Sequence, residues 1–276
     1  YNGSENFAPG KKWGFFPSVA GGWLISNESF MKSLSSTISK MKVRASYGLV
    51  GNDQLAGRRF AYLSTIAGID GYTYGTSGDN AYNGYTEGDF GVNKLTWETV
   101  KKLDLGLELG LWDCVNIQAD YFHERHEKIF MQRKTIPETA GFTSAPWANY
   151  GIVTNQGCEF SLEMNKQFSK DLFLSLRGSF TYAHNKIIEY DEPAALKKTT
   201  RSYTGNPIGT YYGLQAVGVF QEEDFLADGS VKGSIPQPTF GTVHPGDIRY
   251  ADTNHDGKVD ANDYKPLGRP YNPEIV

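Results

Sequence analysis

The chain has few cysteines, no long apolar run and little net charge. Only Cys114 and Cys158 occur among its 276 residues. Cys114 falls in a predicted turn and Cys158 well inside a predicted strand. At about 3.3 Å per residue these positions are too far apart for a disulfide. A disulfide-stapled fold is therefore excluded, and we expect two free thiols.

The longest apolar run covers residues 19–25, which include two glycines. A membrane-spanning helix needs about 20 apolar residues, so a helical membrane protein is excluded. A membrane β-barrel is not, because each of its strands needs only about 9–11 residues, half of them polar.

The signals of nucleic-acid binding and of catalysis are also missing. The formal net charge is -4, too small to indicate a nucleic-acid partner. No G-x-S-x-G, P-loop or dinucleotide fingerprint occurs. His123 and His126 fail the H-E-x-x-H zinc template by one residue. Glu159 and Glu163 share a predicted strand face and could pair as acid and base, but water-facing wall residues explain them better.

What the chain does have is strict alternation of apolar residues with polar residues or glycine. Leucine occupies every odd position from 103 to 111, and polar residues or glycine occupy the even ones. After a turn around Asp113, the alternation resumes through Tyr121. This pattern predicts a β-hairpin with one apolar and one polar face. Its strands are much longer than the typical 5–6 residues, as expected of a wall between lipid and water.

The same pattern recurs along the chain. It predicts strands at about residues 15–26, 40–50, 97–111, 115–130, 151–165 and 171–186. The links 27–39, 112–114 and 166–170 are short or moderate, whereas 51–96, 131–150 and 187–274 are long. Short turns at one rim and long loops at the other are typical of outer-membrane barrels. We therefore predict an all-β, transmembrane antiparallel β-barrel.

Strand parity also assigns faces. If the apolar set faces lipid, the polar set faces the barrel lumen, and it contains Lys42, Arg44, Glu159, Glu163 and Arg177. Tryptophans at strand ends and in loops suit the aromatic girdles of a barrel, and for Trp112 the girdle is favoured. Trp147 and Tyr150 lie in a predicted long loop and are candidate substrate-binding residues, because loop aromatics can also stack on sugar rings.

A calcium-loop motif, D-x-N-x-D-G-x-x-D-x-x-D, occupies residues 252–263. The predicted ligands are the side chains of Asp252, Asn254, Asp256, Asp260 and Asp263 and the carbonyl of Lys258. Gly257 would allow the sharp turn. Aspartate replaces the usual glutamate at position 12, so its reach is shorter. The alternative is an Asx-rich turn without an ion. We expect a structural calcium ion here.

Several segments together resemble the SusC/RagA family of TonB-dependent outer-membrane transporters of Bacteroidetes. They are FPSVAGGW (16–23), KVRASYGLVGND (42–53), LTWE (95–98), DYF (120–122), the spaced Asn149-Tyr-Gly151 and Asn155-Gln-Gly157-Cys-Glu159, and GDIRYADTNHDGKVDANDYKPLG (246–268). Each segment is weak alone, but the set follows the family order over nearly the whole chain.

The resemblance implies a 22-stranded barrel with an N-terminal plug, which acts with a SusD-like lipoprotein. It implies import of glycans, oligosaccharides or peptides, driven through TonB, ExbB and ExbD, and it places the segment 187–274 in an extracellular loop. Signal sequence, TonB box and plug are not in the sequence, and we expect an internal piece of the receptor.

Two other functions compete with this one. The first is a secreted or surface calcium-binding β-protein that binds glycans, and the second is an enzyme such as a glycoside hydrolase. The importer is the expectation that accounts for the whole chain, and its mechanism would be binding and gated passage rather than bond chemistry.

Overall fold

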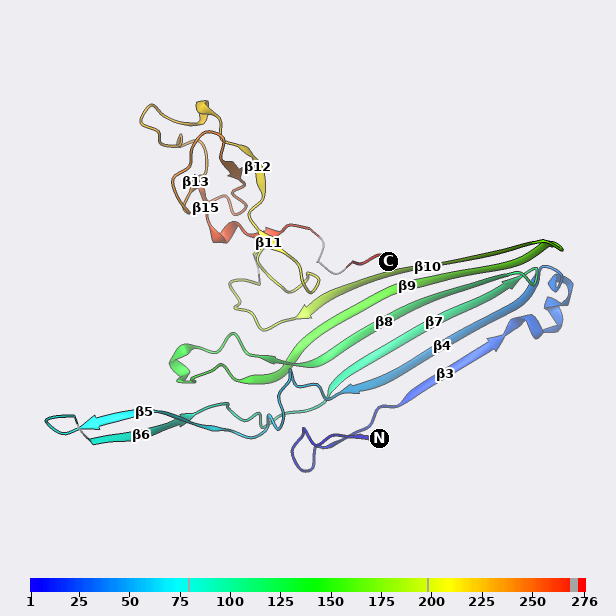
Figure 1. Cartoon of the computed structure of the whole chain (residues 1–276), viewed down its shortest axis with the longest axis horizontal. Coiled ribbons are helices and arrows are strands. Elements are labelled where there is room, and N and C mark those ends of the chain that lie inside the picture. The colour runs from blue at the N-terminus through cyan, green and yellow to red at the C-terminus, as the bar shows by residue number, and fades with distance from the viewer. Residues whose placement is uncertain (79, 198, 269–272) are drawn as a thin grey trace. The chain divides into compact units, whose positions relative to one another are not determined.

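A computed structural model describes residues 1–78, 80–197, 199–268 and 273–276 (Figure 1). It divides into two compact units, Tyr1–Asp191 with Glu274–Val276, and Glu192–Pro273. No helix in the described part of the chain is long and apolar enough to cross a membrane.

The first unit is built on a six-stranded antiparallel sheet with the order β10-β9-β8-β7-β4-β3. Neighbouring strands are joined by turns or loops, so the chain meanders across the sheet (Figure 1). Five of the strands have between 14 and 23 residues. The strands are β3 Ser18–Leu24, β4 Ile38–Asn52, β7 Glu98–Leu111, β8 Val115–Gln132, β9 Trp147–Ser169 and β10 Leu172–Glu189. The all-β architecture predicted from the alternation is confirmed.

Short elements complete both units. In the first unit these are β1 Asn2–Gly3, β2 Trp13–Gly14, the hairpin of β5 Ile66–Tyr74 and β6 Asn80–Glu87, and the 3-10 helices η1 Ile25–Asn27, η2 Ser29–Leu34 and η3 Glu138–Ala140. In the second they are β11 Tyr212–Gly213, β12 Ala216–Val219, η4 Glu222–Asp224, β13 Gln237–Pro238, β14 Ile248–Tyr250, β15 Lys258–Val259, η5 Ala261–Asp263 and β16 Lys265–Pro266. Residues 198 and 269–272 of the predicted segment 187–274 lie outside the described residues.

Two predicted loops contain strands. The segment 51–96 holds the β5–β6 hairpin, whose bulge between Ile69 and Tyr72 hides the alternation. The segment 131–150 is shortened at both ends, since Met131 pairs with Ala148 and Gln132 with Trp147. Beyond the irregularity between His126 and Ile129, the backbone ladder continues although the apolar–polar pattern does not. Hydrogen bonding of the main chain therefore extends these strands further than side-chain pattern indicates.

The sheet does not close on itself. Its edges are β3 and β10, and the last residues of the chain pair with β10. Ile275 bridges to Tyr182, and the main chains of Thr181 and Val276 exchange two hydrogen bonds of 2.9 and 3.0 Å. After the long second unit, the chain thus returns to the edge of the same sheet.

The turn between β7 and β8 has its two central residues in the left-handed region, with φ of 51° at Trp112 and 52° at Asp113. Cys114 N–H donates to the carbonyl of Leu111 at 3.1 Å. Such turns match the right-handed twist of the flanking strands. Both cysteines are free, as predicted.

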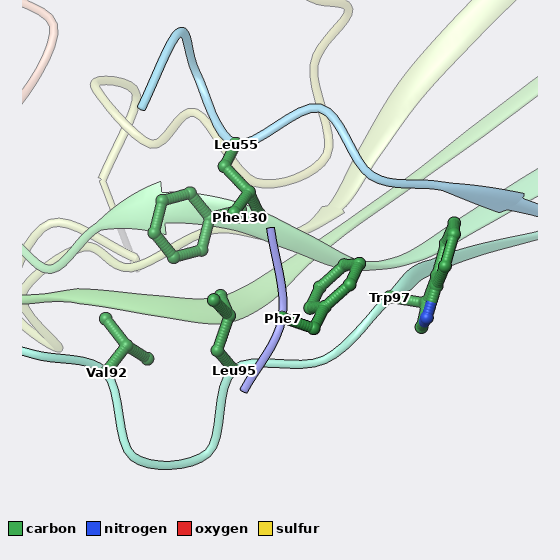
Figure 2. Close-up of a cluster of buried hydrophobic side chains, with 6 residues drawn as sticks. All are labelled: Phe7, Leu55, Val92, Leu95, Trp97 and Phe130. Carbon is green, nitrogen blue, oxygen red and sulfur yellow. The ribbon is translucent and has the colours of Figure 1, made fainter. Parts of the chain in front are cut away.

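A compact hydrophobic core lies where the loops meet the ends of β7, β8 and β9. Its buried members are Phe7, Leu55, Val92, Leu95, Trp97 and Phe130 (Figure 2). Phe7 is fully buried, which contributes roughly 1.5–3 kcal/mol of hydrophobic stabilisation. The Trp97 ring centroid lies 4.8 Å from that of Phe7 and 5.3 Å from that of Phe16. Trp97 is therefore a core residue and not part of an interfacial girdle, because these rings shield its indole.

A buried carboxylate ties the end of β10 to the segment that follows β8. Asp191 is 3% exposed and accepts hydrogen bonds from Arg133 Nε at 2.9 Å, Lys134 N at 2.5 Å and Thr135 Oγ1 at 2.8 Å. Burial alone raises the pKa of Asp191, but the hydrogen bonds from Arg133, Lys134 and Thr135 outweigh it and hold this pKa well below its usual range.

This depressed pKa predicts an acid-sensitive segment. Above the unfolded-state pKa of about 3.9, the ionised Asp191 stabilises the fold, and this contribution is lost as pH falls below that value. We expect amide hydrogen-exchange protection of residues 133–135 to hold from pH 7 to about 4 and then to fall. Asp191→Asn should lower that protection at pH 7, by roughly 1–3 kcal/mol, and remove the acid transition. Asp171→Asn, on an exposed turn, is the matched control; equal behaviour of the two variants would contradict the assignment.

Candidate functional site

The strand register assembles one continuous polar face. One cross-strand row of this face consists of Arg44, Gly106, Asp120 and Glu159. The next row contains Lys42, Glu108, Gln118 and Ser161, and the one after it Gly110, Asn116, Glu163 and Arg177. All the residues predicted to share the lumen parity, Lys42, Arg44, Glu159, Glu163 and Arg177, therefore lie on this polar face.

An ion pair crosses a whole strand on the polar face. Arg44 Nη2 lies 2.5 Å from Asp120 Oδ1, although β7 runs between their strands. The pair is possible because Gly106 has no side chain. A Cβ there would lie 2.3 Å from Arg44 Nε and 2.4 Å from Asp120 Oδ1. Asp120 is 9% exposed and also accepts from Gln118 Nε2 at 2.8 Å.

Most other charges on the polar face are paired as well. Glu108 lies 2.6 Å from Lys40 Nζ and 3.4 Å from Lys42 Nζ. Glu163 accepts from Arg177 and Asn165, each at 2.9 Å. A hollow of about 640 Å³ lies over Lys40, Glu108, Gln118, Glu163 and Arg177. The arrangement is a wall of paired charges with a hollow over it. Because Glu163 is held by two donors, it is not a free partner for acid–base work with Glu159.

The opposite face is apolar and exposed. One of its rows runs across all six strands through Trp23, Val43, Leu107, Ala119, Phe160 and Phe180. Val43, Phe160 and Phe180 are 41–42% exposed. From Leu103 to Leu111 the apolar stretch on β7 is about 26 Å long at 3.3 Å per residue. At a strand tilt of about 40° this gives a band roughly 20 Å high, close to the ~25 Å apolar band of outer-membrane barrels.

Aromatic residues flank this apolar face. Tyr47, Tyr121 and Tyr182 are 36–51% exposed on it toward the long-loop ends of the strands. Trp112 is 58% exposed at the β7–β8 turn, at the opposite ends. An apolar band thus lies between two levels of aromatic residues, as it does on the lipid-facing surface of membrane barrels.

Trp147 and Tyr150 are not where the pattern predicted. Both belong to β9 rather than to a loop. One side of the Trp147 indole stacks on Phe130 at 5.1 Å, and the Arg58 guanidinium lies 4.8 Å from the same ring. The Arg133 guanidinium lies 4.7 Å from the Tyr150 ring. Phe130 and Arg58 both pack on the Trp147 ring, so Trp147 is a packing residue in this structure. Substrate binding by Trp147 and Tyr150 stays a prediction.

The loop 252–263 is organised by hydrogen bonds between its acidic side chains and its own backbone. Asp252 Oδ2 accepts from Gly257 N at 2.8 Å, and Asn254 Oδ1 accepts from Asp256 N at 2.9 Å. Asp260 caps η5 by accepting from Asn262 N at 2.6 Å. His255 and Gly257 adopt φ of 60° and 83°, so Gly257 supplies the expected sharp turn.

Asp263 is fully buried and closes this loop. Its Oδ1 accepts from Thr253 N at 2.7 Å, Thr253 Oγ1 at 3.2 Å and Asn254 N at 3.3 Å, and its Oδ2 from Asp260 N at 2.8 Å. Burial alone raises the pKa of Asp263, but the amide hydrogen bonds lower it below its usual range. Its oxygens are hard donors that suit calcium, yet Oδ1 has no lone pair to spare.

The described residues contain no set of three or more His, Cys, Asp or Glu side chains converged to hold a metal ion. In the loop 252–263 the donor types fit calcium, while the backbone amides already engage the side chains. Calcium binding by this loop stays a prediction.

Sequence reasoning missed three features: Asp120 and Glu108 as ion-pair partners, Gly106 as the gap beneath the Arg44–Asp120 pair, and the buried Asp191. The parity of β7 and β8 could have identified the two acids. The role of Gly106 depends on register across three strands, and that of Asp191 on a contact with residues far away in sequence, so neither has a local signal.

Residues 1–267 match the family model for the TonB dependent receptor-like β-barrel. The chain is similar to TonB-dependent receptor P3 of Formosa agariphila, with 31% identity over 98% of this chain and 26% of the relative. It is also similar to TonB-dependent receptor SusC of Bacteroides thetaiotaomicron, with 30% identity over 68% of this chain and 18% of the relative. The chain thus spans about a quarter or less of these relatives.

Solved structures agree with this assignment at the level of fold. The RagAB peptide importer in its closed-closed state superimposes with a TM-score of 0.71 at 17% identity, over 99% of this chain and 28% of that chain. The open-open state of RagAB gives a TM-score of 0.69 at 19% identity, over 98% and 27%. Receptors of this family are transporters of the outer membrane and not enzymes. The chain belongs to the TonB-dependent receptor-like β-barrel family and is of the SusC/RagA type.

Proposed function

We propose that this chain is part of the barrel wall of an outer-membrane importer that takes up oligosaccharides or other glycans, or peptides, with a SusD-like lipoprotein and with energy delivered through TonB, ExbB and ExbD. The observation that carries the proposal is the pair of opposed faces on one sheet of long strands. One face is exposed and apolar, and the other is lined with paired charges.

The polar face suits a passage wall. Its ion pairs keep charged side chains in place, and the Arg44–Asp120 pair stays close to the backbone because Gly106 leaves room for it. A water-filled path bounded by such pairs presents hydrogen-bond donors and acceptors without one dominant charge. That chemistry is compatible with neutral glycans and with peptides. A secreted calcium-binding protein is not favoured, since it would expose the apolar face to water.

Matched glycine substitutions test whether Gly106 makes room for the ion pair on the polar face. Gly106 lies on the polar face between Arg44 and Asp120, and Gly178 lies on the apolar face with open space beyond it. We expect Gly106→Leu to break the ion pair and lower the amount of full-length receptor in the outer membrane, through an overpacking cost of about 1–3 kcal/mol. Gly178→Leu should leave that amount near the parent's. Equal amounts of the two variants, or the reverse order, would contradict the role assigned to Gly106.

Uptake in cells tests the transport function. Cells lacking the full-length receptor should lose growth on a subset of a panel of oligosaccharides and peptides and regain it on complementation. Loss of TonB or of the lipoprotein should abolish the same growth. The class of compound affected distinguishes glycan import from peptide import. Receptor recovered without detergent in the soluble fraction, or growth unchanged by TonB loss, would contradict the proposal.

We also propose that the loop 252–263 holds a structural calcium ion through Asp252, Asn254, Asp256, the Lys258 carbonyl, Asp260 and Asp263. The support is the spacing of oxygen donors along a turn that already has the required bend at Gly257. Calcium would supply charge neutralisation for clustered carboxylates in a unit with few buried apolar residues.

The calcium proposal predicts a metal-dependent resistance to proteolysis. In the full-length receptor, cleavage within residues 252–263 should be slower with calcium than with chelator. Asp252→Ala combined with Asp256→Ala should remove most of that difference. Asp228→Ala is the matched control, since Asp228 accepts from Ser230 N in a similar exposed turn of the same unit outside the loop. Identical cleavage of the parent in calcium and in chelator would rule the site out.

A further inference from the structure

The apolar face ends in a row of cations at the long-loop ends of the strands. The register places Leu49, Lys101, Arg125, Thr154 and Lys186 in one row across β4, β7, β8, β9 and β10. Side chains in a cross-strand row of this kind project from the same face. Three of the five residues are cations, and we call Lys101, Arg125 and Lys186 the cationic row.

The cationic row occupies a defined level of the apolar face. Moving along the strands, a row with Leu105, Tyr121, Cys158 and Tyr182 comes first, and then one with Leu103, His123, Gln156 and His184. The cationic row follows directly. Along the strands, apolar residues are followed by aromatic and then by basic ones. Membrane proteins show this order from the hydrocarbon core through the interface to the lipid headgroups.

The charges of this row are not balanced within the described structure. Glu127 lies 2.9 Å from Lys101 Nζ and 2.7 Å from Arg125 Nε, so one carboxylate serves two cations. Glu189, one row further out, hydrogen bonds with Tyr150. Lys186 is exposed. The face therefore carries an excess of positive charge at this level, where anionic groups would complement it.

We propose that the cationic row binds the phosphate groups of lipids in the outer leaflet of the outer membrane, that is, a phosphorylated glycolipid of the lipid A class. The inference rests on the proposed function, because it needs the apolar face to be in lipid and the long loops to be outside the cell. Arg125 can pair with phosphate oxygens through its guanidinium fork, and the two lysines act as point charges. Tyr121 and Tyr182 lie beneath these cations, at the depth of the acyl–headgroup boundary.

Lipid discs of defined composition test whether the cationic row binds lipid phosphates. Full-length receptor is purified and placed in phosphatidylcholine discs that contain either phosphorylated lipid A or the same lipid A with its phosphates removed. Retained lipid is counted by native mass spectrometry. We expect the parent to retain the phosphorylated form at least about tenfold better, which corresponds to 1.4 kcal/mol. The triple variant Lys101→Gln, Arg125→Gln, Lys186→Gln should lose this preference.

The control variant removes three exposed lysines elsewhere. Lys102 lies on the polar face and pairs with Glu124 at 2.7 Å, while Lys32 and Lys170 lie near the turns. Lys32→Gln, Lys102→Gln, Lys170→Gln should keep the parent's preference. No preference in the parent, an unchanged preference in the cationic-row variant, or an equal loss in the control would overturn the inference.

The same preparation distinguishes failure of the lipid site from failure of the proposed importer function. Receptor recovered with the outer membrane and inserted into discs, but indifferent to phosphate, would refute the lipid site and leave the importer intact. Receptor that is absent from the outer-membrane fraction would refute both.

Discussion

Lateral main-chain hydrogen bonding between long strands is the constraint on which this structure depends. It joins β3 to β10 in a register that is continuous over the central part of each strand, and the two-residue period of a strand then sends alternate side chains to opposite faces. A slip of one residue in any strand would exchange its two faces. The apolar face, the polar face and the cationic row all follow from this one register.

The sheet has two open edges, and the main-chain groups of these edge strands need hydrogen-bond partners. The edge strands β3 and β10 have main-chain groups available, and residues Glu274–Val276 begin to use those of β10. In lipid, such groups need partners, and closed barrels provide them. The chain spans about a quarter or less of the curated relatives it matches, and under the proposed function the rest of such a receptor would supply the remaining main-chain partners.

Charge is used differently on the two faces. On the polar face, acids and bases pair across strands, and Gly106 allows Arg44 to reach Asp120 over an intervening strand. At the end of the apolar face, cations outnumber acids. The first arrangement suits a hydrated wall with no strong preference for charge, and the second suits contact with an anionic layer. Beyond the strands, Asp191 and Asp263 serve a third purpose, since each gathers several donors into a buried turn.

The sequence by itself determined the all-β class, the long hairpin and the two faces, because alternation over many residues is a local signal that packing does not override. Its ordered motifs, through their resemblance to known receptors, indicated the family. Only the tertiary structure decided the rest. The β5–β6 hairpin and the outer parts of β8 and β9 depend on main-chain pairing that side-chain pattern does not record. Trp97 and Trp147 became packing residues because Phe7, Phe16, Phe130 and Arg58 reach them from distant parts of the chain. The cationic row existed in the sequence only as scattered basic residues, and it became a single feature when the register placed them side by side.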